Sequence, residues 1–291
     1  SSVTDNKVSH DKITRLLSNK IEAKTLWQQA KPMVEQVKSS QGLLIIDDSI
    51  EAKKHSKTNP LINWHFDHCS GKSVKGVNFV SSFYYSPECD MGLPVGVEFV
   101  RKDKQVTDGK GKLSFKSKET KNEMMRRMVG HANSNIGFKY VLADSWFSSS
   151  ENMNCITNQC NSDFIMALKS NRVVALTKQD KAKGNYQSIK SLMPEGRTMS
   201  VYLKQYSKPI QIAKQVFKNG DGSTGALYLA TSDLSLDYQS LTTIYQKRWK
   251  VEEFFRSIKN NAAFAKAPTK TIRTSQAHFI ASMIAYLKLE R

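Results

Sequence analysis

Apolar residues follow two spacings along the chain, and these predict strands and helices in alternation. Short continuous apolar runs, such as Leu43 to Ile46, are typical of strands buried on both faces of a sheet. Strands are expected on this basis at 42–49, 74–85, 93–100, 138–144 and 164–168. Apolar residues three and four positions apart predict helices at 6–37, 117–133, 241–259 and 278–289, and another helix begins near Ser150. The pattern therefore predicts an α/β fold whose first three strands form an antiparallel meander.

The pattern changes between residues 169 and 232. Further strands are expected there at 173–177, 199–205, 210–216 and 226–230, separated by Gly, Pro, Lys and Asn. We interpret this part as a β-rich subdomain inserted into a larger core. The expected domains are a helical N-terminal segment (1–40), the first part of the core (41–168), the insertion (169–232) and the C-terminal helices of the core (233–291). The first segment is too short for its own core, so we interpret it as the remnant of a DNA-binding domain.

Four long polar residues share one edge of the helix expected at 241–259. On a continuous helix, Tyr245, Arg248, Glu252 and Lys259 fall within about 60° of one another. They border the apolar face, where a carboxylate between two cations is not needed for solubility. Each of these residues alone would be interpreted as an ordinary solvent-exposed polar side chain. Together they indicate a functional site.

Charge and composition narrow the choice of partner. The 291 residues carry 44 Lys and Arg against 26 Asp and Glu, a net charge of +18 with a pI near 9.7. Such an excess is typical of proteins that bind polyanions, and nucleic acid is the leading candidate. The four cysteines have no framework spacing, which favours a reducing cytoplasm. No apolar run is long enough to predict a membrane span.

Acidic residues end two of the expected strands and a third lies on the late helix. Asp47 and Asp48 follow the first strand, Asp144 ends a later strand, and Glu252 lies on the helix. Carboxylates gathered at a sheet edge are the ligands that hard divalent cations prefer. Alternation along a strand puts Asp47 and Asp48 on opposite faces, so only one of the two is expected to bind metal.

These residues resemble the signature of a known family, the DDE insertion-sequence transposases. Tyr245, Arg248, Glu252 and Lys259 match the family spacing of Tyr, two residues, Arg, three residues, Glu, six residues, Lys. The sequence Asp47-Asp48-Ser49 is similar to the first acid motif of the family and 141–147 to the second, within a resemblance that spans 43–289.

The resemblance implies a ribonuclease-H-like mixed sheet flanked by helices and an activity that cuts transposon ends and joins their 3′ hydroxyls to target DNA. Asp47, Asp144 and Glu252 would hold two Mg²⁺ ions, for which Mn²⁺ could substitute. The side chains expected to grip the DNA backbone are Tyr245, Arg248 and Lys259. The implied partner is double-stranded DNA, bound by a homodimer, and the implied location is the bacterial cytoplasm in association with the nucleoid.

Members of this group commonly form a hairpin on the transposon end, with a flipped base stacked on an aromatic residue. The insertion contains no Trp, so we expect Tyr186, Tyr202 or Tyr206 to take that role. The Asp-x-Ser alignment favours Asp47 over Asp48 as the first ligand.

Two other functions stay open at this point. One is a DNA-binding relative that has lost catalysis, and the other is a ribonuclease-H-like nuclease that does not join strands. A zinc site at His65, Asp67, His68 and Cys69 is not favoured because no second ligand pair follows at a usable spacing. Basic segments near Lys53 and Arg101 become plausible phosphate contacts if the core binds DNA.

Overall fold

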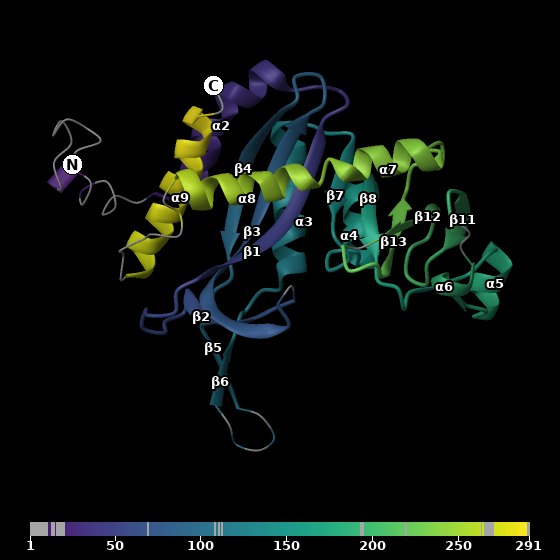
Figure 1. The fold of residues 1–291 in the computed structure, drawn as a ribbon, viewed down its shortest axis with the longest axis horizontal. Helices are drawn as coiled ribbons and strands as arrows, with labels where there is room; N and C mark the ends of the chain where they lie inside the picture. Colours follow the sequence, from purple (N-terminus) through teal and green to yellow (C-terminus); the bar gives the residue numbers. More distant parts are fainter. Residues whose placement is uncertain are drawn as a thin grey trace.

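A computed structural model shows a mixed sheet with helices on both faces (Figure 1). It describes residues 11–12, 15, 21–68, 70–107, 109, 111, 113–192, 195–218, 220–262, 264 and 271–289. The large sheet of the described residues has nine strands: β1 (Leu43–Ala52), β2 (Ile62–Asp67), β3 (Lys72–Ser86), β4 (Met91–Phe99), β7 (Tyr140–Ala143), β8 (Asp163–Leu168), β11 (Thr198–Tyr202), β12 (Pro209–Lys218) and β13 (Thr224–Thr231).

The strand order confirms the predicted ribonuclease-H-like fold. β3 pairs antiparallel with β1 and β4, which gives the expected meander, and β1 then pairs parallel with β7, and β7 with β8. Ile46 lies opposite Ala143 in the parallel register, so Asp47 and Asp144 directly follow paired residues. The two acids therefore lie at the same edge of the sheet, on neighbouring strands.

The strands of the expected insertion extend this same sheet. β8 pairs antiparallel with β13, which is followed by β12 and then β11. A separate small sheet joins β9 (Val173–Val174) and β10 (Gln187–Ser188), beside the short helices α5 (Lys178–Lys183) and α6 (Ile189–Leu192). The segment expected as an insertion contains β9 to β13, and its main strands, β11 to β13, are continuous with the core sheet.

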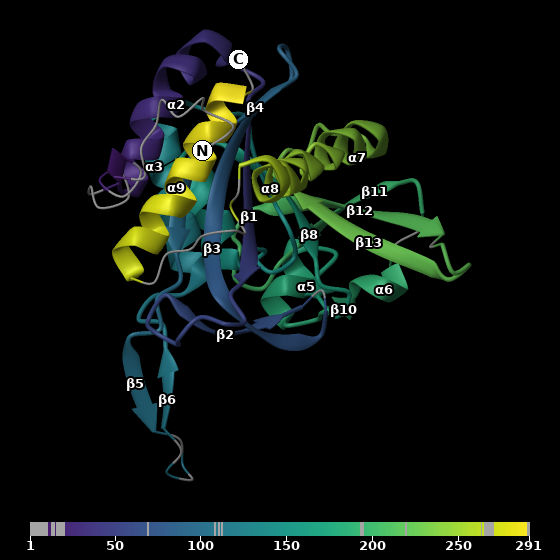
Figure 2. The same ribbon diagram turned by 60° about the vertical axis from the view of Figure 1, so that its left-hand side comes forward.

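The longer helices cover both faces of the sheet and its β4 side. They are α2 (Ala23–Val37), α3 (Lys121–Asn135), α7 (Tyr238–Gln246), α8 (Trp249–Asn261) and α9 (Ile272–Leu289), and α4 (Ser150–Asn154) continues into a π-helical turn at Cys155–Gln159. Phe79 and Phe83 of β3 contact Phe255 and Phe254 of α8. α3 packs on the opposite face, and α2 and α9 pack against each other beside β4 (Figures 1 and 2). The expected helix N-terminal to α2 lies largely outside the described residues.

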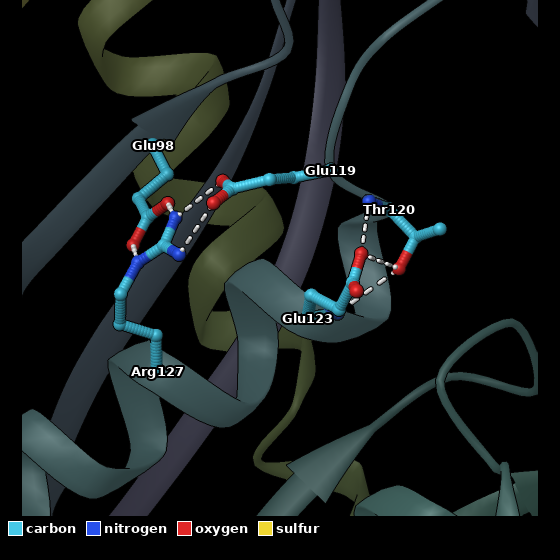
Figure 3. Close-up of polar contacts among 5 residues, drawn as sticks. All are labelled: Glu98, Glu119, Thr120, Glu123 and Arg127. Atoms are coloured by element: carbon cyan, nitrogen blue, oxygen red, sulfur yellow. Dashed lines mark hydrogen bonds and ion pairs between the residues drawn. The ribbon is translucent and has the colours of Figure 1, made fainter.

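A polar network fixes the start of α3 against β4 (Figure 3). The Thr120 hydroxyl accepts the backbone N–H of Glu123, whose carboxylate accepts the N–H of Thr120 at 2.7 Å. One turn later, the Arg127 guanidinium lies between the carboxylates of Glu98 on β4 and Glu119 before the helix. The network holds α3 in place over the sheet edge that carries the acids.

Several elements differ from the prediction. The helix expected at 241–259 is two helices, α7 and α8, which run nearly end to end (Figure 1). The strand β2 was not predicted, although its apolar and polar residues alternate; two of its apolar side chains, Trp64 and Phe66, are exposed. A hairpin of β5 (Lys104–Thr107) and β6 (Leu113–Lys116) occupies the basic connection before α3.

Candidate active site

Asp47 is a buried carboxylate at the edge of the sheet. Its Oδ1 accepts the backbone N–H of Asp48 at 2.9 Å, and its Oδ2 accepts Arg248 Nη1 at 2.9 Å. Burial raises the pKa of Asp47 to about 7, and nearby Asp144 and Asp48 act in the same direction, while Arg248 lowers the pKa. The Asp47 carboxyl group therefore gives up its proton near neutral pH.

Arg248 connects this strand end to helix α8. Its Nη2 donates to Glu252 Oε1 at 2.6 Å while Nη1 contacts Asp47. Since one planar guanidinium spans both contacts, the bonded oxygens of Asp47 and Glu252 lie no more than about 8 Å apart. Among the described side chains, buried Arg248 Nε is one of few nitrogens without a hydrogen-bond acceptor. The Nε–H of the guanidinium is thus a donor without an acceptor among the described residues.

Asp144 joins this cluster from strand β7. Its Oδ1 accepts the backbone N–H of Trp146 at 2.9 Å, which holds the carboxylate at the strand end. Burial is the main cause that raises the pKa of Asp144, and the charge of Asp48 adds to it. Asp144 also raises the pKa of Asp47 through the repulsion of their charges. Arg248 thus contacts Asp47 and Glu252 directly, and Asp144 interacts electrostatically with both Asp47 and Arg248.

Asp48 has a different partner on the other face of the sheet. Its Oδ2 accepts Lys121 Nζ at the start of α3. The neighbouring carboxylates thus diverge as strand alternation predicts, with Asp47 toward α8 and Asp48 toward α3. Both aspartates interact electrostatically with Asp144.

Lys259 lies farther along α8, over the same face of β1. Its Nζ is 3.4 Å from Ser49 Oγ and 3.9 Å from Glu51 Oε2. Asp47, Ser49 and Glu51 alternate on one face of the strand, so α8 places Arg248 and Lys259 over successive positions of that face. Sequence reasoning missed Glu51 because the strand was expected to end at residue 49. The sequence did contain a clue: Glu51 is four residues after Asp47, so a longer strand would place both on the same face.

Tyr245 is buried, which differs from the prediction that its hydroxyl faces DNA. The hydroxyl donates to the carbonyl oxygen of Ala143 at 3.3 Å, next to Asp144, and burial raises the pKa of Tyr245. The helix that was predicted to be continuous is also interrupted just after Tyr245. Around Lys247 and Arg248, backbone N–H groups bond three residues back instead of four. The angular positions expected for one continuous helix therefore do not hold for Tyr245 relative to the residues of α8.

Trp146 forms part of the site boundary beside Asp144. Its indole is 40% exposed and lies 5.6 Å from Lys121 Nζ and 5.2 Å from Lys169 Nζ, measured to the ring centre. The ring of His68 lies 4.8 Å from it. Tyr206, by contrast, is buried, and its hydroxyl donates to Thr157 Oγ1 at 3.2 Å. Tyr206 is therefore not available to stack a base.

The carboxylates have the right chemistry for a divalent cation, but the described residues contain no group of three or more His, Cys, Asp or Glu side chains close enough to hold one. Arg248 occupies the space between Asp47 and Glu252, and Lys121 engages Asp48. Near His65, Asp67 accepts the Ser70 hydroxyl at 2.6 Å. Cys69 lies outside the described residues.

Comparison with known proteins gives a family match. The family model described as "Transposase DDE domain" matches residues 112–288, which include Asp144, Arg248 and Glu252 but not Asp47. No curated protein matches the chain. The crystal structure of human endonuclease V is 9% identical, with 92% of this chain and 99% of that chain covered at a TM-score of 0.30. A crystal structure of its catalytic domain is 10% identical, with 91% of this chain and 96% of that chain covered at a TM-score of 0.31.

The helices that the structure describes include no candidate for a membrane span.

Proposed function

The chain belongs to the transposase DDE domain family, and from this premise we propose that it cleaves transposon ends and transfers the freed 3′ hydroxyls into target DNA. One observation carries the proposal: the Arg248 guanidinium joins Asp47 of β1 to Glu252 of α8, with Asp144 beside them. These residues come from distant parts of the chain. Their convergence at one sheet edge supports a catalytic centre over a solvated charge cluster.

We propose Asp47, Asp144 and Glu252 as the ligands of two Mg²⁺ ions, with Mn²⁺ as a substitute. Bound ions would supply positive charge beside the attacking and leaving oxygens of the phosphodiester. The carboxylates fit by donor chemistry, although Arg248 now neutralises two of them. Asp47 is preferred to Asp48 because it shares Arg248 with Glu252, whereas Asp48 is paired with Lys121. Asp47→Asn should therefore reduce cleavage more than Asp48→Asn.

Arg248 and Lys259 are proposed to contact phosphates of the DNA. The buried Nε–H of Arg248 has no acceptor, and a phosphate that entered the site would compete with the carboxylates for the guanidinium. DNA binding would then release Asp47 and Glu252 for the metal. Tyr245 acts differently in this proposal: through its bond to Ala143 it positions the strand end that carries Asp144.

Cleavage of DNA carrying candidate element ends tests the proposal. Glu252→Gln should abolish Mg²⁺-dependent cleavage, because it removes one carboxylate charge at nearly unchanged size, while DNA binding measured by fluorescence anisotropy stays within about twofold. Glu253→Gln, the same substitution one residue along α8, is the matched control and should cleave normally. Full cleavage by the Glu252→Gln variant would contradict the assignment.

Strand transfer separates the transposase from the alternatives. A pre-cut 3′ end should be joined to a target duplex by the unmodified protein, with double-stranded DNA as substrate and a homodimer as the proposed active form. Cleavage without joining would favour a ribonuclease-H-like nuclease, and binding without either reaction would favour an inactive relative. We propose the bacterial cytoplasm, in association with the nucleoid, as the place of action.

A further inference from the structure

The β5–β6 hairpin projects from the body of the protein as an isolated two-stranded ribbon. Both views show it extending below β2, away from the helices that cover the sheet (Figures 1 and 2). β5 and β6 pair only with each other, with Lys104 opposite Lys116 and Thr107 opposite Leu113. A hairpin of this kind is marginal by itself in water. Its persistence as a projecting ribbon points to a partner outside the fold.

The side chains of the ribbon do not pack on the rest of the protein. Leu113 is 56% exposed and Phe115 is 51% exposed, although large apolar side chains are usually covered. Gln105 and Thr107 lie on the same face of the ribbon as these two residues, because they occupy the opposed cross-strand positions. This face combines apolar contact area with polar groups that can donate and accept hydrogen bonds.

The other face of the ribbon carries an unfavourable pair of like charges. Lys104 and Lys116 are directly opposed across the two strands, and such pairs destabilise a hairpin unless an anion lies between or near them. The whole segment 101–118 contains seven Lys and Arg and two Asp, a net charge of +5. Two such segments would repel each other, so the charge argues against a second copy of the chain as the partner. It favours a polyanion.

A series of side-chain contacts connects the ribbon's side of the molecule to the candidate active site. Lys121, which pairs with Asp48, lies over the Trp146 ring, and Trp146 contacts His68, which in turn contacts Phe66 of β2. Just before β5, Lys102 Nζ donates to the carbonyl oxygen of Trp64, also on β2. These contacts lead from Asp48 across the exposed rings of Trp146, His68 and Phe66 to β2, and the partly buried Lys102 connects β2 to the start of the ribbon. Aromatic rings interleaved with lysines are typical of nucleic-acid contacts.

We propose that the β5–β6 ribbon is a groove-binding arm that holds duplex DNA beyond the cleaved end. A two-stranded β-ribbon fits the major groove of B-form DNA, where Leu113 and Phe115 would contact base edges and Lys104 and Lys116 would contact phosphates. The residues across β2 would contact the DNA strand between the ribbon and the carboxylates. The inference rests on the proposed function only in that DNA is the substrate, and it does not depend on cleavage.

Binding of a duplex of arbitrary sequence tests the arm, because phosphate contacts do not depend on sequence. Fluorescence anisotropy over a series of KCl concentrations gives the dissociation constant and its salt slope. The double variant Lys104→Glu and Lys116→Glu should weaken binding at least tenfold at low salt and reduce the slope of log K against log[KCl] by about 1.8, the loss of two phosphate contacts. Phe115→Ser should weaken binding with an unchanged slope, because it removes an uncharged contact.

Two lysines on α5 provide the matched control. Lys178→Glu and Lys183→Glu impose the same charge change at exposed positions far from the ribbon (Figure 1), and this variant should bind within twofold of the unmodified protein. Equal losses in both double variants would overturn the proposal, because they would reflect net charge alone. Unchanged DNA binding by the ribbon variants would also overturn it, and a shift of their sedimentation toward monomer would assign the ribbon to self-association. Since the readout is binding without Mg²⁺, failure of the proposed catalysis would leave the result unaffected.

Discussion

Burial sets the chemistry of Asp47 more strongly than its cationic neighbour does. Although Arg248 contacts the carboxylate, removal from water raises the pKa of Asp47 to about 7. A metal ion or a second cation would reverse this balance by favouring the charged form. The side chain is therefore ionised most readily when the site is filled.

The pH dependence of stability follows from this shift. Unfolding exposes Asp47 and returns its pKa toward 3.8, so between about pH 4 and 7 the folded state binds more protons than the unfolded state. The free energy of unfolding should therefore fall as pH rises through this window. Asp47→Asn should make the fall shallower, as measured by urea unfolding at several pH values. Asp90→Asn, which removes an exposed carboxylate whose pKa is lowered, should keep the fall.

Removal of Arg248 should destabilise the fold. Arg248→Ala leaves buried Asp47 without its cation, and a loss of about 3–5 kcal/mol is expected at pH 8, where the carboxylate is charged. In the double variant with Asp47→Asn the loss should be smaller than the sum of the single losses, because the uncompensated charge is absent. Additive losses in urea unfolding would show that the pair is not coupled.

At the scale of elements, strongly patterned segments were predicted well from sequence and irregular ones were not. The apolar runs of β1, β7 and β8 are buried on both faces, and short continuous apolar runs are typical of such strands. The break at Lys247 was invisible because it contains neither Gly nor Pro and keeps helical dihedral angles. The β5–β6 ribbon was missed because each strand has only four residues and β5 contains a single apolar residue, Val106.

The start of α3 offers a test at this scale. Thr120→Ala should lower the free energy of unfolding by about 1 kcal/mol, because it removes the hydroxyl that accepts the Glu123 N–H. Thr120→Ser keeps that acceptor and should stay close to the unmodified protein. The two variants can be compared by urea unfolding. Equal destabilisation would show that the methyl group of Thr120, rather than its cap, is responsible.

At the scale of the whole molecule, the sequence predicts contacts within one helix but not the contacts of that helix with distant segments. Arg248 and Glu252 are four residues apart, and the sequence placed them together correctly. Their proximity to Asp47 depends on the parallel pairing of β1 with β7 and on the crossing of α8, which no local pattern specifies. The burial of Tyr245 likewise follows from tertiary packing and could not be predicted from helix angles.

The net positive charge of the whole molecule predicts that removal of metal abolishes catalysis but leaves DNA binding largely intact. Phosphate contacts by lysines and arginines need no divalent ion, so EDTA should abolish cleavage while changing the dissociation constant for duplex DNA by less than about threefold. Anisotropy and gel analysis of the same samples measure both. Loss of binding with EDTA would indicate that metal organises the DNA surface itself.

The continuity of the sheet limits how this protein can be shortened by engineering. Because β13 covers the edge of β8, a chain trimmed of β11, β12 and β13 would present an apolar strand edge to solvent. Such edges recruit other strands and cause aggregation. A minimal catalytic unit would therefore need to keep β13, or replace it with a charged strand, if it is to remain monomeric in solution.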